Sequence, residues 1–196
     1  MTGVQTCALP ICQFSFACLQ NADPVLGVDM SSTGEVGCLG DDLNEALLNA
    51  LIATGYRLPK SGSSILISSG AAKGKVSLLE PAMQLVKKGY KVYATGGTAK
   101  FFNDNGVKAT AVSWPDEEGE NNVMDMIADH QFSLIINVPK NHTKRELTNG
   151  YRIRRGAIDH NIPLMTNVRL AKAFIEDFTA LDESSIKIKS WQEYNS

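Results

Sequence analysis

Short apolar runs alternate with amphipathic segments from Ser64 to about residue 180, and this alternation restricts the fold more than any other feature of the sequence. The runs are about four residues long and apolar throughout, as in residues 65–67 (ILI), and the segments between them carry apolar residues at helical spacing. Strands that are apolar on both faces are typical of a parallel sheet covered by helices on both sides. We therefore predict a doubly wound α/β domain over about residues 60–180.

The individual elements can be placed by their ends. The expected strands are residues 65–68, 91–94, 109–112, 134–137 and 164–166. The expected helices are residues 75–88, 98–105, 123–130, 152–161 and 168–177, with a helical turn over 143–149. Outside this domain, the pattern predicts a helix over 42–54 with Asp41 as its N-cap, irregular structure with room for one short strand over 13–40, and an edge strand over 186–189.

Composition and charge exclude several classes of function. Of the 196 residues, 43% are hydrophobic and 20% are charged, values that exclude a disordered or collagen-like chain. The 19 basic and 21 acidic residues give a net charge of -2, so no overall field draws the chain to nucleic acid or to an anionic membrane, and any anion site must be local. No apolar run approaches the roughly 20 residues of a membrane-spanning helix. Neither nucleic acid nor membrane is an expected partner.

The beginning of the chain differs in character from the rest. It holds all four cysteines of the sequence, Cys7, Cys12, Cys18 and Cys38. They share no metal-ligand spacing with a histidine, and a reducing, cytoplasmic setting is the simpler interpretation. Residues 1–12 lack the basic start of a signal peptide, and residues 4–11 resemble the translation of a common sequencing adapter. We expect residues 1–12 to be a non-native leader, in which case the native protein continues upstream.

The loop between the second strand and its helix is the first candidate anion site. Ligands of an open parallel sheet bind at the carboxyl ends of the strands. Residues 94–99 (ATGGTA) lie there: Gly96 and Gly97 allow close approach of the backbone, and the hydroxyls and free helix N–H groups can bind a phosphate or carboxylate. A tight turn with Thr98 as N-cap explains the same residues equally well.

Two further polar segments are candidates for the same edge of the sheet. Asn137 closes the fourth strand and Lys140 adds positive charge in the loop that follows, although a solvated turn would look alike. Residues 152–155 (RIRR) are expected to open a helix, where arginines oppose the helix dipole and need a counter-charge. They can clamp an anion with paired hydrogen bonds, or they can form a surface cluster with acids such as Asp159.

Signals for catalysis are missing from the sequence. Lys73 and Lys75 follow the first strand and can add charge, and Trp114 opens a polar loop over 116–122, although packing is the commoner role of a single tryptophan. The sequence contains no phosphate-binding P-loop, no nucleophile elbow and no metal-ligand cluster. The three histidines share no spacing typical of a triad or zinc site. No catalytic residue and no metal ligand is predicted.

Several motifs occur together in the order found in one enzyme family. Residues 23–37 (DPVLGVDMSSTGEVG) resemble the end of the second synthetase half of carbamoyl phosphate synthetase large chains. The later segments KGYKVYATGGTAKFF, SLIINVP and GYRIRRGAIDHNIPLMTN resemble the C-terminal methylglyoxal-synthase-like domain of that enzyme. The resemblance covers about residues 13–195. It implies that residues 13–58 are the tail of the ATP-grasp half with a connecting helix, and that residues 59–196 are a Rossmann-like regulatory domain.

The resemblance also implies a function. The intact enzyme is an ATP-dependent ligase that uses ATP, Mg, bicarbonate and ammonia from a glutaminase subunit or domain to make carbamoyl phosphate for pyrimidine and arginine synthesis. Its active sites lie upstream, so this chain is expected to be a non-catalytic fragment without a cofactor that works with the rest of the large chain. In the family this domain binds an anionic effector such as UMP, IMP or N-acetylglutamate.

Effector contacts are expected from ten residues. Those matched to the family's contacts are Lys73, Thr95, Thr98, Trp114 and Asn137. Those added from the motifs above are Gly96, Gly97, Lys140, Arg154 and Arg155. Departures from the N-acetylglutamate-responsive branch at Lys140, at residues 96–97 and around residues 149–150 favour a nucleotide monophosphate over a small diacid.

Two enzymes of similar fold are the alternatives. A free-standing methylglyoxal synthase, a phosphate-eliminating lyase, needs a carboxylate base and a Gly-Gly-Asp loop, whereas residues 113–122 read SWPDEEGENN. The cyclohydrolase domain of purine synthesis needs a Lys-Thr-Leu-His-Pro segment that the chain lacks. Neither enzyme explains the synthetase-like segment at residues 23–37, so a regulatory domain is the favoured hypothesis and the lyase is the alternative.

Overall fold

The computed structural model describes residues 7–12, 21–25, 35–119, 121–139, 144–180, 189 and 191–194. The chain divides into two compact units. The larger unit comprises Ser15–Gly27 and Pro59–Lys172, and the smaller comprises Met1–Phe14, Val28–Leu58 and Ala173–Ser196.

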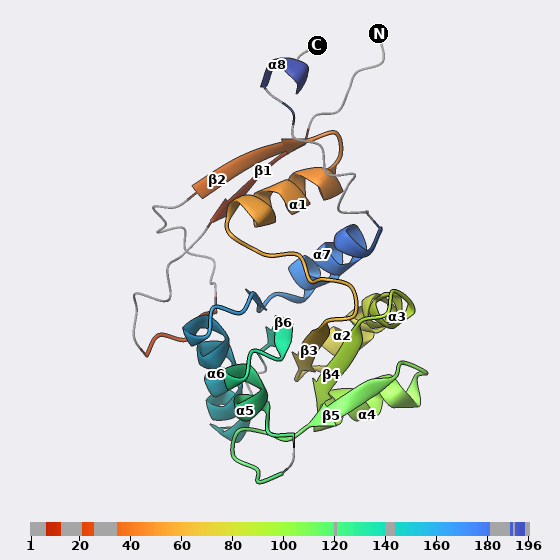
Figure 1. Ribbon diagram of the computed structural model, residues 1–196, viewed down its shortest axis with the longest axis vertical. Coiled ribbons are helices and arrows are strands. Elements are labelled where there is room, and N and C mark those ends of the chain that lie inside the picture. The colour runs from red at the N-terminus through yellow and green to blue at the C-terminus, as the bar shows by residue number, and fades with distance from the viewer. Residues whose placement is uncertain are drawn as a thin grey trace. The chain divides into compact units, whose positions relative to one another are not determined.

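The larger unit is built on a five-stranded parallel sheet in the order β5-β4-β3-β6-β7 (Figure 1). Its strands are β3 (Ser64–Ser69), β4 (Lys91–Thr95), β5 (Ala109–Val112), β6 (Phe132–Val138) and β7 (Leu164–Met165). All five predicted strands of the domain are therefore present, and every pairing between them is parallel.

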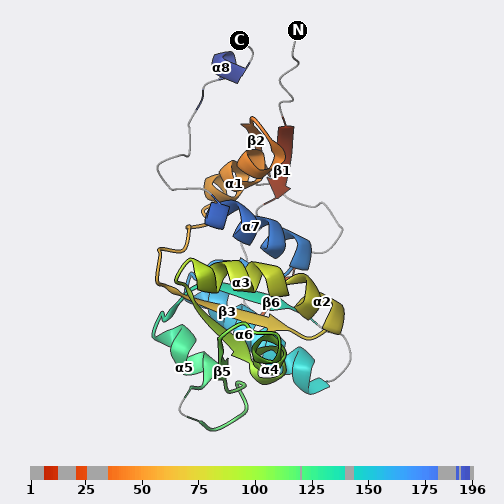
Figure 2. The ribbon, with the colours of Figure 1, turned by 90° about the vertical axis from the view of Figure 1, so that its right-hand side faces the viewer.

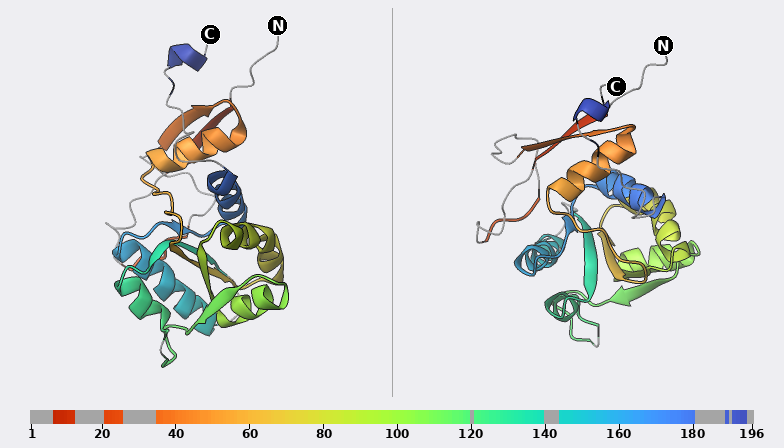
Figure 3. Two further views of the ribbon diagram at one scale, coloured as in Figure 1. Left: turned by 45° about the vertical axis from the view of Figure 1, so that its right-hand side comes forward. Right: turned by 45° about the horizontal axis from the view of Figure 1, so that its top comes forward.

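Helices cover both faces of this sheet. They are α2 (Ala72–Ser77), α3 (Leu79–Lys87), α4 (Gly96–Asp104), α5 (Val123–Ala128) and α6 (Lys144–Asp159). The first three lie on one side of the sheet and the last two on the other (Figure 3). The doubly wound α/β fold is thus confirmed. A further helix, α7 (Val168–Ala180), begins in the larger unit and continues in the smaller.

The two central strands form the core of the sheet. Residues 65–67 of β3 and 134–136 of β6 are completely buried, as expected for strands that are covered on both faces. Val123 and Ile127 of α5 and Ile153 of α6 pack against this pair. Burial of each such aliphatic side chain contributes roughly 1.5–3 kcal/mol relative to exposure, so the apolar strand runs hold the sheet together.

The strand order creates a switch point between β3 and β6. From β3 the chain winds outward through β4 to β5, then returns to lay β6 on the other side of β3. The ends of these strands are in register, with Ser68 beside Asn137 and Ser69 beside Val138. Helices approach the sheet from opposite sides at such a point, and their loops diverge to leave a crevice at the carboxyl ends of the strands.

One predicted helix is divided in two. Residues 75–88 were expected to form one helix, but α2 ends at Ser77 and α3 begins at Leu79. Figure 2 labels the two helices separately. Pro81 lies in the first turn of α3, where its missing N–H and its ring cannot extend the hydrogen bonding of α2. The break turns Leu78 fully into the core.

The opposite correction applies to α6. A helical turn over 143–149 and a separate helix from Arg152 were expected, but α6 runs without interruption from Lys144 to Asp159. The segment 152–155 therefore lies within the helix and not at its start. Gly150 lies inside this helix at a crowded position, where a Cβ would lie 2.9 Å from Nη1 of Arg154.

The smaller unit holds an antiparallel strand pair and a helix. The strands β1 (Cys7–Cys12) and β2 (Glu35–Gly40) pair from Cys7–Gly40 to Cys12–Glu35. The strand β1 was not expected, because no structure was assigned to residues 1–12. The backbone pairing with β2 is what gives that segment a regular structure. The chain ends in a short helix, α8 (Trp191–Tyr194).

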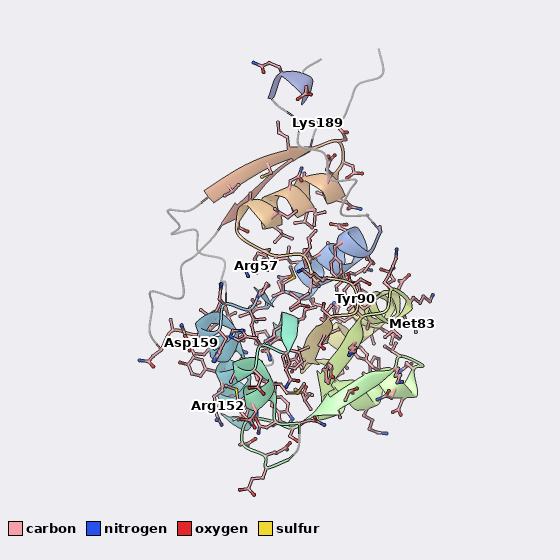
Figure 4. All side chains as sticks on the ribbon, viewed as in Figure 1. Arg57, Met83, Tyr90, Arg152, Asp159 and Lys189 are labelled. Carbon is pink, nitrogen blue, oxygen red and sulfur yellow. The ribbon has the colours of Figure 1, made fainter. Side chains whose placement is uncertain are left out.

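The helix α1 (Leu43–Ala53) begins with two side-chain caps that resemble a capping box, except that Glu45 binds the residue before the N-cap. Asp42, and not the predicted Asp41, is the N-cap, and its carboxylate accepts a 2.8 Å hydrogen bond from the amide of Glu45. Glu45 accepts in return from the amide of Asp41 at 2.7 Å. Asp41 also forms an ion pair with Lys189, which Figure 4 labels. The rest of the expected strand at 186–189 lies outside the described residues.

Candidate functional site

A cavity of about 230 Å³ opens at the carboxyl ends of β3, β4 and β6, beside the start of α4. It lies in the larger unit, at the switch point of the sheet. Its lining residues are Ser68, Ser69, Gly70, Lys75, Thr95, Gly97, Thr98, Trp114, Asn137, Val138, Pro139, Leu147, Gly150 and Arg154. None of them is acidic and none is a histidine, so the lining is rich in hydrogen-bond donors.

Buried hydroxyl groups form one wall of the cavity. The hydroxyls of Ser68 and Thr95 are 3.0 Å apart and share one hydrogen bond, which leaves one of the two protons free for a ligand. The Thr98 hydroxyl donates to the Ser69 carbonyl at 3.1 Å and accepts from the Ser69 amide at 3.2 Å. One interpretation of the sequence made Thr98 the N-cap of its helix. In the structure Thr98 does not cap α4 and instead links that helix to β3 through Ser69.

The Ser69 hydroxyl stands out from this group. It is buried, and within the described part of the chain it has no hydrogen-bond partner. A buried polar group without a partner costs about 1–3 kcal/mol. The hydroxyl oxygen lies against α2, 2.4 Å from where a Cβ on Gly74 would be. The sequence analysis missed Ser69, although its position at the end of an apolar strand, in register with Val138, is where a ligand contact is expected.

Positive potential at the cavity comes from Lys75 and from α4. The Lys75 Nζ donates to the Gly97 carbonyl at 3.1 Å, which holds the ammonium beside the start of the helix. The first N–H groups of α4 have no intrahelical acceptor, and the Thr95 side chain does not cap them. An ammonium group next to free helix N–H groups is a suitable environment for a phosphate or carboxylate.

Lys75 takes the position that was predicted for Lys73. Lys73 is exposed and does not line the cavity. Residues two apart on a helix point in different directions, so only one of the two lysines of α2 can face α4. The sequence placed both after the same strand and did not distinguish them.

Arg154 reaches the cavity from the middle of α6. Its side chain is buried, and its Nη1 donates to Oδ1 of Asn137 at 2.8 Å. The same guanidinium forms an ion pair with Asp23. Arg155 turns the other way and pairs with Asp159, through a 2.9 Å hydrogen bond that lowers the pKa of Asp159. Of the two roles that the sequence left open for Arg155, the structure thus shows the surface ion pair with Asp159. Figure 4 labels Asp159 near one end of α6.

Apolar side chains form the remaining wall. Trp114 is half-buried and packs against the core, and Leu147 is 46% exposed. The backbone of Trp114 is held by its own loop, with its amide donating to Glu117 at 2.9 Å and its carbonyl accepting from Asn122 at 3.1 Å. A flat or apolar part of a ligand would find its surface here.

The loop after β5 is fixed to α6 by two contacts. The Asn149 side-chain amide donates to Asp116 at 2.6 Å, and the Arg152 guanidinium donates to the Pro115 carbonyl at 3.0 Å. Both contacts lie next to cavity residues, one helix turn or less along α6. Asp116, an acid of this loop, is thus engaged by the amide of Asn149.

The structure brings together six of the ten predicted contact residues. The cavity is lined by Thr95, Gly97, Thr98, Trp114, Asn137 and Arg154. Gly96 is the first residue of α4, between two lining residues, but does not itself line the cavity. Lys73 and Arg155 lie away from it, and Lys140 lies outside the described residues. No set of three metal-ligating side chains occurs among the described residues, and no described helix can cross a membrane.

The chain is similar to part of several much larger proteins and belongs to the family of carbamoyl phosphate synthetase MGS-like domains. Residues 77–166 match the MGS-like domain family. The chain is 42% identical over 190 residues to the multifunctional protein CAD of Squalus acanthias, which covers 90% of this chain and 8% of that protein. It is 41% identical over 167 residues to the human mitochondrial carbamoyl-phosphate synthase [ammonia], with coverages of 83% and 11%.

A yeast protein and one solved structure are also similar to the chain. The multifunctional protein URA2 of Saccharomyces cerevisiae is 40% identical over 178 residues, with coverages of 86% and 8%. The chain thus spans about a tenth of the length of these relatives. Among solved structures, a methylglyoxal synthase from Elizabethkingia anophelis aligns over 60% of this chain and 79% of its own, with 22% identity and a TM-score of 0.43.

Proposed function

Because the chain contains an MGS-like domain and is homologous to proteins that contain carbamoyl phosphate synthetase, we propose that it is the effector-binding, regulatory domain of such a synthetase. The observation that carries this proposal is the cavity at the sheet edge. Among the described residues, its lining offers hydroxyls, an amide, an ammonium and free helix N–H groups, and no carboxylate. Such a lining binds an anion and offers no general base to transform it.

The same cavity supports a phosphate-bearing effector. Lys75 and the start of α4 provide for a compact, doubly charged group, while Trp114, Pro139 and Leu147 provide an apolar surface for a ring. A nucleotide monophosphate combines these two parts, whereas N-acetylglutamate offers two carboxylates and no ring. The effector shifts the synthetase by its differential affinity for two states of the whole enzyme, typically 1–3 kcal/mol of coupling.

The intact protein is part of the same proposal. In it, the domain would regulate an ATP-dependent ligase that uses ATP, Mg and bicarbonate, with ammonia from a glutaminase subunit or domain. The division into a leader, a synthetase tail and a regulatory domain, with boundaries after residues 12 and 58, is also a proposal. The cytoplasmic setting is a proposal too, because the human relative named above is mitochondrial.

The first prediction tests the cavity as an anion site. Titration of the chain with UMP, IMP and N-acetylglutamate by calorimetry should show binding of a nucleotide, with a matching rise in melting temperature. Lys75→Gln should weaken that binding about tenfold, because an ammonium beside a phosphate is lost. Lys73→Gln is the matched control, since it removes an equal charge two residues away that does not line the cavity.

Two results would contradict the proposal. Equal affinities of the Lys75→Gln and Lys73→Gln variants would remove the cavity as the binding site. Release of methylglyoxal from dihydroxyacetone phosphate by the chain would favour the lyase instead. The described lining residues include no acidic or histidine side chain, which speaks against that alternative.

A further inference from the structure

The buried guanidinium of Arg154 binds a residue far away in the sequence. Its Nε donates to Oδ1 of Asp23 at 2.6 Å, and its Nη2 forms an ion pair with the other carboxylate oxygen. The two residues are 131 positions apart and belong to the same compact unit. Paired, nearly parallel hydrogen bonds of this kind are the strongest arrangement between an arginine and a carboxylate.

The two partners of this ion pair differ in their exposure to solvent. The Arg154 side chain is 3% exposed, whereas that of Asp23 is 42% exposed. A buried cation requires a counter-charge, but an exposed carboxylate can return to water at little cost. Asp23 can therefore leave Arg154 if another anion takes its place, while Arg154 cannot do without an anion.

Asp23 sits on a short, locally ordered segment. The Val25 amide donates to the Asp23 carbonyl at 2.8 Å, and Pro24 between them is buried. Residues 21–25 are thus docked on the larger unit through one buried proline and one ion pair. Movement of the carboxylate would carry this segment with it.

The other side of the guanidinium faces the cavity. Its Nη1 donates to Oδ1 of Asn137, which leaves the amide NH2 of Asn137 as the group available to a ligand. Gly150 leaves the space for this contact, since a Cβ there would lie 2.9 Å from Nη1 and 3.7 Å from Oδ1 of Asn137. Arg154 is the one arginine among the lining residues that the structure describes, and Asp23 neutralises it.

We propose that Asp23 is an internal competitor of the effector: its carboxylate holds Arg154, and an anion that enters the cavity displaces it and releases the segment 21–25. This inference rests on the proposed function and assigns its regulation. Because linkage is reciprocal, docking of residues 21–25 weakens anion binding by the same factor by which the anion weakens docking. Residues 21–25 belong to the larger unit, but the segment Val28–Leu58 separates them in the chain from its main part, Pro59–Lys172.

The decisive experiment removes the competing charge and leaves the shape. The full chain and its Asp23→Asn variant are titrated with inorganic phosphate by calorimetry. Asp23→Asn should bind phosphate about tenfold more tightly, since a single negative charge several Å from the bound anion is removed. The gain should vanish in the double variant Asp23→Asn with Arg154→Met. Asp159→Asn, which frees an arginine that does not line the cavity, is the matched control and should leave the affinity unchanged.

A second measurement follows the segment itself. Hydrogen exchange of the amides in residues 21–25 should rise in the full chain at saturating phosphate, and it should rise without phosphate in Arg154→Met. Equal phosphate affinities of the full chain and Asp23→Asn, or exchange in 21–25 that ignores both phosphate and Arg154→Met, would overturn the inference. Failure of the proposed function would differ: phosphate affinity would still rise in Asp23→Asn, while UMP, IMP and N-acetylglutamate would all fail to bind.

Discussion

At the scale of single residues, similar side chains in this cavity have different tasks. Thr95 and Thr98 lie three residues apart and both were expected to contact a ligand. The Thr98 hydroxyl is fully used by the backbone of Ser69, whereas the pair formed by Thr95 and Ser68 keeps one proton free. Hydrogen-bond partners across 29 residues of chain are not visible in a sequence, so only the structure separates the two roles.

The two threonines should therefore respond differently to substitution. Thr98→Ala leaves the buried amide and carbonyl of Ser69 without this partner and should lower the free energy of unfolding by about 1–3 kcal/mol. Thr95→Ala should change stability less and effector affinity more. Urea denaturation measures the first effect and calorimetry the second. Thr98→Ser keeps the hydroxyl and should restore most of the stability; a Thr98→Ala variant as stable as the original chain would contradict this assignment.

At the scale of elements, the sequence predicted the strands better than the helix ends. The apolar runs that become β3 and β6 are buried on both faces, and a pattern with that cause is visible locally. The break at Leu78 and the continuity of α6 through Gly150 depend on neighbours that are remote in the chain. For the same reason the sequence pointed to Gly97 and Asn137, which line the cavity, but not to Ser69, and it did not distinguish Lys75, which lines the cavity, from Lys73, which does not.

The continuity of α6 gives a prediction about Gly150. Gly150→Ala places a methyl group 2.9 Å from the Arg154 guanidinium, so the contact with Asn137 must shift. Although alanine favours a helix, we expect a net loss of about 1–3 kcal/mol in the free energy of unfolding. Gly96→Ala, in the first turn of α4 with open space around it, is the control and should change stability little. Thermal denaturation of the two variants compares them, and a stabilised Gly150→Ala would contradict the packing argument.

At the scale of the whole molecule, one buried acid should make stability depend on pH. Burial, with the nearby charges of Glu176 and Asp42, raises the pKa of Asp177 to about 7. Its Oδ2 has no hydrogen-bond partner within the described residues, in keeping with a group held in its neutral form. The unfolded chain releases this proton near pH 4, so stability contributed by the neutral form is lost as pH rises from about 4 to about 7.

The corresponding variant tests the sign of this dependence. Asp177→Asn keeps the size of the side chain and removes its titration, so its stability should stay flatter between pH 4 and pH 7. At pH 8 we expect it to exceed the original chain by about 1–2 kcal/mol. Urea denaturation at several pH values measures both quantities. Glu176→Gln is the neighbouring control, and an unchanged pH profile in Asp177→Asn would refute the assignment.

The position of β6 next to β3 has a consequence for biosynthesis. Ser68 and Asn137, which meet at the cavity, are separated by the whole of β4, α4, β5 and α5 in the order of translation. A nascent polypeptide that has left the ribosome as far as residue 112 contains the serine and threonine hydroxyls of the cavity and the glycines at the start of α4. It still lacks β6, which forms the other side of the cavity. The cavity is therefore complete only after β6 and then α6, which carry Asn137 and Arg154, have both been translated.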